Sequence, residues 1–470
     1  MGTRQGVYID GAWSDGGGAD ELTIRSSADG TVVGVITAAA EQQVDAAVRA
    51  AAAAFPGWSA TPVAVRTAAL RAIADGVESR TEELAALSSH EVGTTIAISR
   101  AIQVGLALQV LRSTADAMDA LELTEDCGQF MVEREPVGVV AAITPWNFPL
   151  HQIVAKLAPA IASGCTIVVK PAELSSLSAV ALFDIIDSVG LPTGVANLVC
   201  GTGPVVGEAL VMHPLVDMVS FTGSTRAGTR IGELAMRDVK KVSLELGGKS
   251  ATVILDDADL GRAVNVSLGS CYTNNGQMCA ALTRLIVQRS QLAEVEELLA
   301  KAVAKFTPGD PFADGTRLGP LASETQRDRV IGYIESGIAE GARVLAGGPE
   351  RPDGAGYFVQ PTIFTDVTSG MTIAQEEIFG PVLVVIPVDS EQEALDVAND
   401  SAFGLSGAVW SADRDRAIAF ARRIRTGQVA INGGAFNASA PFGGYKKSGI
   451  GRELGRHGLE EFFEFKALLV

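Results

Sequence analysis

The sequence contains one cysteine whose surroundings suit nucleophilic chemistry. Cys279 ends the segment Asn275–Cys279 (NGQMC), which follows a helical pattern beginning at Asp259. A glycine-containing turn can present the sulfur to a cleft, and nearby backbone N–H groups favour the thiolate. The alternative is a cysteine that only packs in the core. The other four cysteines are interpreted in that way: Cys127, Cys165, Cys200 and Cys271.

A carboxylate that could act as a general base ends an apolar strand pattern. Glu245 stands between two leucines and is followed by Gly247 and Gly248. Apolar surroundings raise the pKa of a carboxyl group toward the range that is useful for a base. The alternative is an exposed glutamate above a turn, and this segment alone favours neither interpretation.

A side-chain amide lies in a predicted strand-to-helix turn. Asn147 is the centre of Pro145–Pro149 (PWNFP). From such a turn it could donate a hydrogen bond to an oxyanion in a cleft. Taken alone, an asparagine in this position more often caps the N-terminus of a helix.

Three further turns could bind a dinucleotide. Gly201–Gly207 follows a strand, but its GxGxxxG spacing misses the usual GxGxxG pattern by one residue. Phe221–Ser224 opens a helix whose N-terminus could face a phosphate. Lys170 and Glu173 place an ammonium and a carboxylate where ribose hydroxyls could be held. Each of these turns, taken singly, is also compatible with ordinary turn chemistry.

Strands and helices alternate regularly from Val137 onward. Strands are predicted at Val137–Thr144, Thr166–Lys170, Val195–Cys200, Val216–Thr222 and Lys241–Leu246. Helices are predicted at Pro149–Ser163, Ser175–Val189, Pro204–Met212 and Thr225–Arg237. Apolar strands separated by amphipathic helices indicate a parallel sheet covered on both faces, which is a doubly wound α/β fold. A second strand–helix series begins at Ala251–Leu255 and extends to about Pro441.

The two ends of the chain have other patterns. A helix is predicted at Glu41–Phe55, and a second is predicted to run toward Ser89, with Thr61 as its N-cap and Pro62 as its first helical residue. A β-prone segment follows Asp119, and the tail Leu459–Val470 alternates like one more strand. Pairing of that strand within the chain and pairing with another subunit are both compatible with the pattern.

Composition excludes several classes of function. A chain of 470 residues is too long for one ordinary core, which predicts two domains with an appendage. A formal charge of -18 argues against a nucleic-acid surface and a polybasic membrane contact. Residues 1–10 lack the apolar centre of a signal peptide, and Lys156, Pro159 and Gly164 interrupt the longest apolar stretch, so no membrane span is predicted.

Cysteine and histidine usage points in the same direction. The 5 cysteines are odd in number and have no CxxC spacing, which suits the reducing cytoplasm. The 4 histidines are scattered and form no HExxH motif, so a zinc-dependent mechanism is not predicted.

Seven motifs in a fixed order identify a family. They are PWNFP, VVKPAE, FTGST, ELGGKS, NGQMC, EEIFGP and PFGGYKKSGIGRELG. Together they resemble the aldehyde dehydrogenase superfamily from about Tyr8 to Phe465. The resemblance implies a cofactor domain at residues 1–118 and 138–247, a catalytic domain at 248–446, and a small β oligomerisation element at 119–137 and 456–470. It also implies a homodimer or a homotetramer.

The resemblance assigns roles to particular residues. The catalytic set is the nucleophile Cys279, the general base Glu245 and the oxyanion donor Asn147. The NAD-binding set is Lys170, Glu173, Gly223, Ser224, Trp146, Glu377 and Phe379. Glu453 matches a glutamate proposed to relay protons. NAD is expected as the cofactor, with NADP possible but disfavoured because Glu173 would repel a 2′-phosphate.

The implied reaction oxidises an aldehyde to a carboxylic acid. The thiolate forms a thiohemiacetal, hydride leaves to the nicotinamide, and water activated by Glu245 hydrolyses the resulting thioester. Two alternatives are transfer of the acyl group to coenzyme A and a non-catalytic binding protein. The presence of Glu245 speaks against the first, and the intact set with Cys279 and Asn147 speaks against the second.

The aldehyde tunnel is also implied by similarity. Its expected walls are Phe148, His151, Gln152, Ala155, Tyr272, Met278, Phe436 and Phe442. Met278 and Ala280, which flank the nucleophile, depart from the commonest patterns, so the walls cannot be copied from one subfamily. The set is mostly apolar and has no Arg or Lys, which predicts medium-chain aliphatic or aromatic aldehydes as substrates.

Overall fold

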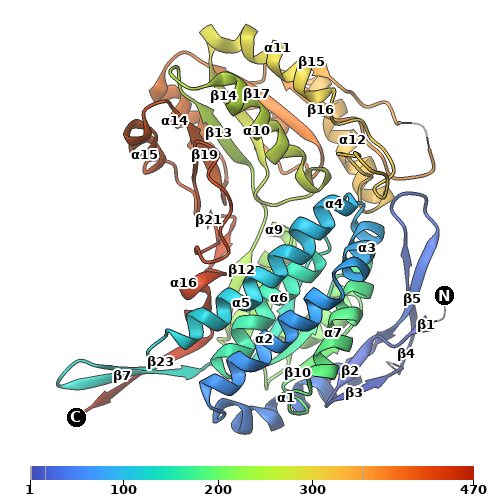
Figure 1. The fold of residues 1–470 in the computed structure, drawn as a ribbon, viewed down its shortest axis with the longest axis vertical. Coiled ribbons are helices and arrows are strands. Elements are labelled where there is room, and N and C mark those ends of the chain that lie inside the picture. The colour runs from blue at the N-terminus through green and yellow to red at the C-terminus, as the bar shows by residue number, and fades with distance from the viewer. Residues whose placement is uncertain (1–2, 16, 353) are drawn as a thin grey trace.

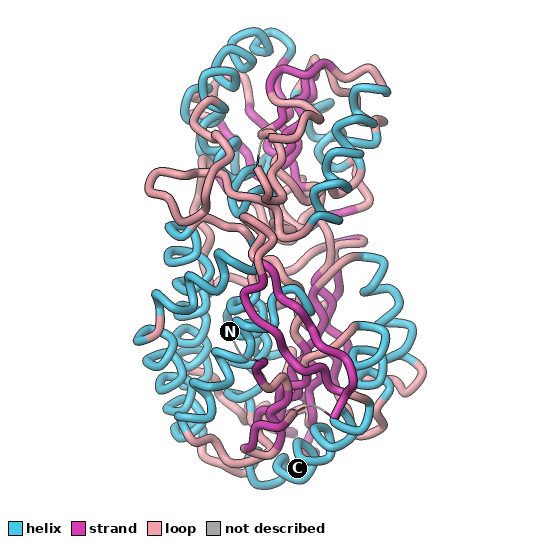
Figure 2. The backbone as a smooth tube through the Cα atoms, turned by 90° about the vertical axis from the view of Figure 1, so that its right-hand side faces the viewer, coloured by secondary structure: helices cyan, strands magenta, loops and turns pink. Residues whose placement is uncertain are grey.

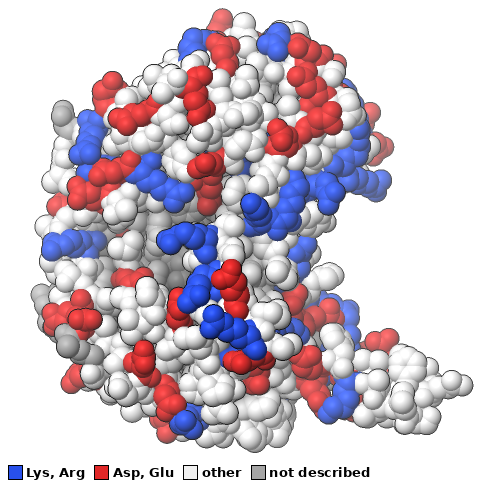
Figure 3. Space-filling view, turned by 180° about the vertical axis from the view of Figure 1, so that it is seen from behind, with Lys and Arg blue, Asp and Glu red and all other residues white. Residues whose placement is uncertain are grey.

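The computed structural model describes residues 3–15, 17–352 and 354–470. The chain forms two α/β lobes and a thin arm that projects from the first lobe (Figure 1). In the side view, the strands of each lobe lie between helices (Figure 2). The space-filling view shows a hollow between the second lobe and the arm, with charged residues of both signs interspersed on that face (Figure 3). The predicted α/β fold class is confirmed.

The first lobe contains an eight-stranded sheet. Its parallel strands are β8 (Val139–Ile143), β9 (Thr166–Lys170), β10 (Ala196–Val199), β11 (Met218–Thr222) and β12 (Lys241–Glu245). Antiparallel pairings extend the sheet at both ends, with β22 (Gly449–Ile450) beside β12 at one end, and β2 (Val7–Ile9) beside β10 followed by the edge strand β3 (Ala12–Ser14) at the other. The order β12-β11-β8-β9-β10 reverses direction between β8 and β11. Ligands of doubly wound sheets bind at such a switch point, beyond the carboxyl ends of the strands.

Helices cover both faces of this sheet. They are α1 (Glu41–Ser59), α2 (Val63–Ser79), α3 (Thr81–Val92), α5 (Gly105–Asp119), α6 (Pro149–Ser163), α7 (Ser176–Val189), α8 (Glu208–Met212) and α9 (Thr225–Met236). Helix α6 begins with a proline and ends before Gly164, whose φ of 98° is left-handed. It is buried at every residue because it packs on the sheet and is covered by α2 and α5. Its nearly all-apolar sequence follows from that position.

Two predictions at the N-terminal helices are wrong in detail. The helix expected from Thr61-Pro62 to Ser89 is divided at Arg80 into α2 and α3. Thr61 does not cap it, because the Thr61 hydroxyl donates back to the Gly57 carbonyl at 3.0 Å and Pro62 takes the cap position. Before α1, strands β1 (Thr3–Arg4), β4 (Gly17–Arg25) and β5 (Val32–Ala39) form a small separate sheet.

The second lobe contains a seven-stranded sheet. Its order is β15 (Arg343–Ala346), β16 (Thr362–Thr365), β17 (Val382–Val388), β14 (Leu282–Gln288), β13 (Ser250–Ile254), β19 (Gly407–Trp410) and β20 (Ala430–Ile431). All neighbours are parallel except β15 and β16. Helices α10 (Leu260–Tyr272) and α11 (Leu292–Val303) cover one face of this sheet, with a hydrophobic core between them and the strands. The other core lies under α12 (Glu324–Ala339), α14 (Glu391–Asn399) and α15 (Arg414–Ala421).

The arm is a three-stranded antiparallel sheet. It contains β6 (Thr124–Asp126), β7 (Phe130–Pro136) and β23 (Phe463–Leu469). The C-terminal strand pairs with β7 of its own chain, and residues 455–460 before it form the short helix α16. Phe465 and Leu469 on this arm are 57% and 86% exposed. Among the described residues, no helix combines the length and the apolar character that a membrane span requires.

The lobes meet where two sheet edges face each other. The turns after β8, β9, β11 and β12 leave the carboxyl edge of the first sheet. The segments that enter β13, β14 and β17 reach the amino edge of the second sheet. Gly247–Lys249 connects the two edges directly, between β12 and β13. Residues on these segments therefore gather at the lobe junction.

Candidate active site

A rigid turn places Cys279 at the entrance of β14. Asn274 and Asn275 after α10 both have left-handed backbones, with φ of 53° and 59°. Asparagine tolerates this region better than most residues, and here its side chain also fixes the turn. The Asn275 amide donates to the carbonyls of Gly93 at 2.9 Å and Pro320 at 2.8 Å. The turn is thereby held to the first lobe and to a loop of the second.

Cys279 is partly exposed as a residue, although its sulfur is buried, whereas Cys165, Cys200 and Cys271 are buried altogether. Burial of the sulfur, with the negative charges of Glu377 and Glu245, raises the pKa of Cys279. The thiol form is therefore favoured, and its proton must leave before the sulfur attacks.

Asn147 is fixed beside the cysteine loop. Its side-chain Nδ2 donates to the Gln277 carbonyl at 3.0 Å. Its own carbonyl accepts from Gln103 Nε2 and from Asn274 Nδ2, both at 2.9 Å. The capping interpretation does not hold, because the N-cap of α6 is Phe148 and no side chain caps it. An amide carries two N–H donors, so the second remains for a ligand.

Glu245 is a buried carboxylate at the end of β12. It is 2% exposed, and within the described residues neither carboxylate oxygen has a hydrogen-bond partner. Burial and the charge of Glu453 raise its pKa, although Lys156 and Arg452 act in the opposite direction. Two buried oxygens without a partner are costly for a fold and mark a group kept for a ligand or for water.

Lys156 is a buried cation that did not stand out in the sequence. It is fully buried in α6, donates to Thr222 Oγ1 at 2.7 Å and forms an ion pair with Glu453. Sequence reasoning noted Lys156 only as an interruption of an apolar stretch. A lysine in a helix that is otherwise apolar was the signal, because a buried ammonium requires a partner.

The cofactor candidates lie around the switch point of the first sheet. Lys170 Nζ donates to the Pro171 carbonyl at 2.9 Å and lies 3.4 Å from Glu173 Oε1. Glu173 also accepts from the Gly203 N–H at 2.7 Å. The GxGxxxG segment therefore holds Glu173, and it follows β10 and not the switch point itself.

The other cofactor candidates bridge the junction. Ser224 caps α9 by accepting from the Ala227 N–H at 3.3 Å, and Gly223 precedes it at the helix N-terminus. Glu377 accepts from the Gly248 N–H at 3.0 Å. Trp146 and Phe379 come from different lobes, and their rings meet edge to face at 5.4 Å.

These residues fit a dinucleotide. A carboxylate with an ammonium suits a ribose, a helix N-terminus suits a pyrophosphate, and an aromatic pair suits a nicotinamide ring. The buried Thr144 hydroxyl, at the carboxyl end of β8, has no protein partner in the described parts of the chain. An orphaned donor at the switch point is what a bound cofactor would satisfy.

Half of the predicted tunnel walls lie on helix α6 or at its N-cap. Phe148, His151, Gln152 and Ala155 follow helical spacing along α6 and are at most 8% exposed. Burial lowers the pKa of His151 to about 4, so its ring is neutral. His151 Nδ1 and Gln152 Oε1 are buried without a partner among the described residues. This part of the predicted wall therefore carries two unpartnered polar atoms among its apolar neighbours.

The other four predicted wall residues lie in different surroundings. Phe436 and Phe442 meet edge to face at 6.0 Å, and Met278 is partly exposed. Tyr272 lies in the core of the second lobe, where its hydroxyl donates to the Thr362 carbonyl at 3.1 Å. Because its phenol is held there, Tyr272 supplies no free polar group to a tunnel.

Comparison with known proteins agrees with this geometry. The model of the aldehyde dehydrogenase family matches residues 13–468. A 3-succinoylsemialdehyde-pyridine dehydrogenase of a Pseudomonas species is 48% identical over 465 residues, which are 98% of each chain. A mutant of aldehyde dehydrogenase C from Pseudomonas syringae, solved with NAD+ and octanal, is 46% identical with a TM-score of 0.98, covering 99% of this chain and 96% of that one. An aldehyde dehydrogenase of Mycobacterium tuberculosis with NAD+ is 43% identical with a TM-score of 0.97, covering 100% and 98%.

Proposed function

The chain belongs to the aldehyde dehydrogenase family and oxidises aldehydes with NAD, and we propose that Cys279, Glu245 and Asn147 carry out the chemistry. The observation that carries this assignment is the pair of buried carboxylate oxygens of Glu245, which have no partner among the described residues and lie at the lobe junction where Cys279 enters β14. A carboxylate with a raised pKa is suited to accept a proton near neutral pH.

In the acylation half-reaction, the sulfur of Cys279 adds to the aldehyde carbon. The thiol gives up its proton to solvent before the attack, and the thiolate is the form that adds, so Glu245 is not required in this half-reaction. The free N–H of Asn147 and the backbone N–H of Cys279 hold the oxyanion of the thiohemiacetal. When bound, NAD supplies the hydride acceptor at C4 of its nicotinamide. Loss of hydride leaves a thioester on Cys279.

In the deacylation half-reaction, water attacks the thioester. Glu245 removes a proton from that water, and the Glu453–Lys156 pair beside it offers a route for the proton to leave. The carboxylic acid departs, and the sulfur accepts a proton again. This step requires a base that hydride transfer does not require.

Seven residues would hold the cofactor. Lys170 and Glu173 would bind the adenosine ribose, and Gly223 and Ser224 would meet the pyrophosphate at the N-terminus of α9. Trp146, Glu377 and Phe379 would surround the nicotinamide end. Glu173 faces a ribose as a carboxylate, which supports a preference for NAD over NADP.

The two half-reactions allow a direct test. We expect Glu245→Gln to retain one burst of NADH, while steady-state turnover falls by about 10²–10⁴. Asn147→Ala is the contrast, because it should slow the burst itself by about 10²–10³. Stopped-flow absorbance at the NADH band measures both. Equal loss of burst and turnover in Glu245→Gln, or full turnover restored by coenzyme A, would contradict the hydrolytic role.

We also propose medium-chain aliphatic or aromatic aldehydes as substrates. None of the proposed walls is a cation, so a carboxylate-bearing aldehyde would lose hydration without gaining a charge partner. The related enzyme from Pseudomonas syringae was solved with octanal, and another relative is named for a pyridine-bearing semialdehyde. Values of kcat/KM for hexanal, benzaldehyde, acetaldehyde and succinate semialdehyde test this. A preference for the succinate derivative would show that a cation reaches the tunnel.

We propose that the chain has two domains and an oligomerisation element. The cofactor domain comprises residues 1–118 and 138–247, the catalytic domain comprises 248–446, and the oligomerisation element comprises 119–137 and 456–470. Exposed apolar residues on the arm, such as Phe465 and Leu469, are suited to a partner subunit. A homodimer or homotetramer is expected, and sedimentation equilibrium distinguishes them.

A further inference from the structure

A cavity of about 260 Å³ lies at the lobe junction, against the turn that precedes Cys279. Its walls include Thr94 and Ile98 from the first lobe and Gly269, Asn274, Phe306 and Arg317 from the second. Of the eight predicted tunnel residues, Tyr272 is the one that also lines this cavity. We propose that it is a second small-molecule site, which binds a monocarboxylic acid with an apolar body.

A glycine in α10 keeps the cavity open. Gly269 lies inside α10, where glycine is less favourable than alanine. Its φ is not positive, and a Cβ added there would meet nothing within 4 Å. Neither backbone geometry nor packing therefore requires glycine at this position. A larger side chain would extend into the cavity, so the absence of a side chain preserves its volume.

The polar groups of the cavity define the class of ligand. Arg317 is exposed and forms no ion pair with any described residue, although the chain has 55 acidic residues and 37 basic ones. The Thr94 hydroxyl is fully buried and unpartnered within the described ranges. Ile98, Phe306 and Tyr272 supply apolar surface. A guanidinium and a hydroxyl beside apolar walls suit one carboxylate with a hydrocarbon body.

The product of the reaction has this chemistry. Oxidation of a medium-chain or aromatic aldehyde yields an apolar monocarboxylate. The cavity is slightly smaller than the range of roughly 300–1,000 Å³ that is usual for ligand sites, so a short acid suits it. We take the product acid as the occupant, and this choice rests on the proposed function.

A ligand here would contact the catalytic loop. Asn274 lines the cavity, and its side-chain Nδ2 donates to the Asn147 carbonyl at 2.9 Å and the Gln277 carbonyl at 3.1 Å. Displacing this amide would loosen both the oxyanion donor and the segment that leads into Cys279. The acid would therefore inhibit without occupying the aldehyde position, and its inhibition would be non-competitive toward aldehyde.

Binding of hexanoate by isothermal titration calorimetry tests the site without turnover. Cys279→Ala should bind hexanoate like the wild type, so a failure of the catalytic assignment would not affect this measurement. Gly269→Leu should abolish saturable binding, and Arg317→Gln should weaken it about tenfold because a charge-assisted bond is lost. Gly332→Leu is the matched control. Gly332 is also a glycine inside a helix with open space around its Cβ, but it is exposed on α12.

Inhibition kinetics complete the test. Hexanoate should lower kcat for hexanal without raising KM in the wild type and in Gly332→Leu, and this effect should be lost in Gly269→Leu. Unchanged hexanoate affinity in both Gly269→Leu and Arg317→Gln would overturn the proposal, as would purely competitive inhibition. The latter would place the acid in the aldehyde tunnel.

Discussion

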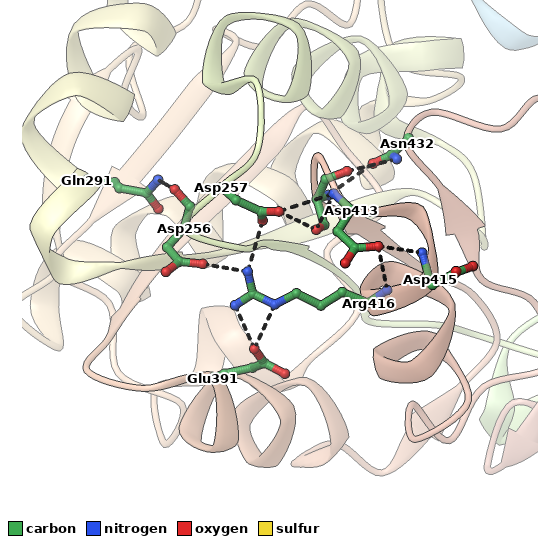
Figure 4. A network of polar contacts seen from close by, with 9 residues as sticks. Asp256, Asp257, Gln291, Glu391, Asp413, Asp415, Arg416 and Asn432 are labelled. Atoms are coloured by element: carbon green, nitrogen blue, oxygen red, sulfur yellow. Dashed lines mark hydrogen bonds and ion pairs between the residues drawn. The ribbon is translucent and has the colours of Figure 1, made fainter.

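The two parallel sheets have the same kind of switch point but fill it differently. In the first sheet the order reverses between β8 and β11, and in the second it reverses at β13, between β14 and β19. At the carboxyl edge of the second sheet, Arg416 meets Asp256 at 2.8 Å, Asp257 at 3.1 Å and Glu391 at 2.7 Å (Figure 4). Asp257 also accepts from the Ser411 hydroxyl at 2.8 Å. Each charge in this cluster has a partner.

The carboxyl edge of the first sheet is the opposite case. The oxygens of Glu245 and the hydroxyl of Thr144 are buried without a partner among the described residues. Burial raises the pKa of Glu245, so its charged form is disfavoured. At the second edge, hydrogen bonds to Glu391 and Asp256 raise the pKa of the Arg416 guanidinium, so its charged form is favoured.

The comparison shows that topology alone does not locate a functional site. Both edges offer a crevice where connections diverge, as doubly wound sheets do. At the second edge, the charged side chains form ion pairs with one another. At the first edge, buried polar side chains have no hydrogen-bond partner among the described residues. A buried polar group without a hydrogen-bond partner lowers the stability of the fold, and it is retained where a ligand forms the missing hydrogen bond.

The largest expected effect is at the junction beside the first edge. Cys279→Ala should lower kcat/KM by at least about 10⁴, and Cys279→Ser should do nearly the same, because a hydroxyl ionises far less readily than a thiol. Thermal stability should stay close to the wild type, since the residue is small and partly exposed. Steady-state NADH production and a melting curve measure both. Normal turnover by the alanine variant would refute the catalytic assignment.

The second expected effect is on stability at the other edge. Arg416→Met leaves Asp256, Asp257 and Glu391 facing one another without their cation. We expect a loss of about 2 kcal/mol in the free energy of unfolding, with kcat changed less than about twofold. Urea unfolding and steady-state kinetics measure these quantities.

Arg414→Met on the same helix is the control, because Arg414 is exposed and has no ion pair among the described residues. A large fall in kcat for Arg416→Met with unchanged stability would mean that the second edge also serves catalysis.

A smaller effect is expected from Glu173→Gln. Glutamine can still accept the Gly203 N–H, so the turn should be preserved while the negative charge is removed. The ratio of kcat/KM for NADP to that for NAD should rise about tenfold, because repulsion of a 2′-phosphate disappears. Kinetics with both cofactors measure the ratio. An unchanged ratio would show that Glu173 does not select the cofactor.

The smallest expected effect is on the pH dependence of thermal stability, and it comes from Glu245 at the first edge. A carboxyl group whose pKa is raised by folding binds its proton more tightly in the folded state, so it destabilises the protein as pH rises above the ordinary range of a glutamate. Glu245→Gln should therefore melt slightly above the wild type at pH 8, with the difference shrinking toward pH 5. Differential scanning calorimetry at both values measures it. A variant that melts lower at pH 8 would mean that the carboxylate has a stabilising partner.

Local signals predicted the elements around the site well. Helix α6 and strand β9 have the bounds expected from sequence, because Pro149 begins the helix and Gly164 ends it. The motifs also placed Cys279, Glu245 and Asn147 on segments that the fold brings to one junction. The ends of helices and strands depend on nearby residues, so hydrophobic periodicity and local start and stop signals predict them.

What the sequence did not reveal depends on distant partners. The Arg416 cluster combines residues that follow β13, β17 and β19, and no periodicity links Asp256 to Glu391. The left-handed pair Asn274-Asn275 is held by Gly93 and Pro320, which lie far away in the chain. Tertiary contacts of this kind override local preference. The division of the Pro62–Ser89 helix at Arg80 likewise has no glycine or proline at the break itself, because the nearest glycine, Gly76, lies inside α2.

The position of β22 has a consequence for how the protein is made. Strand β12, which carries Glu245, gains its outer neighbour when Gly449 and Ile450 pair with it. During synthesis the whole second lobe emerges before those residues do, so the edge of β12 remains uncovered throughout that time. An uncovered strand edge is a template for pairing with other chains. A nascent or truncated chain that lacks its last residues is therefore exposed to aggregation at the strand that bears its catalytic base.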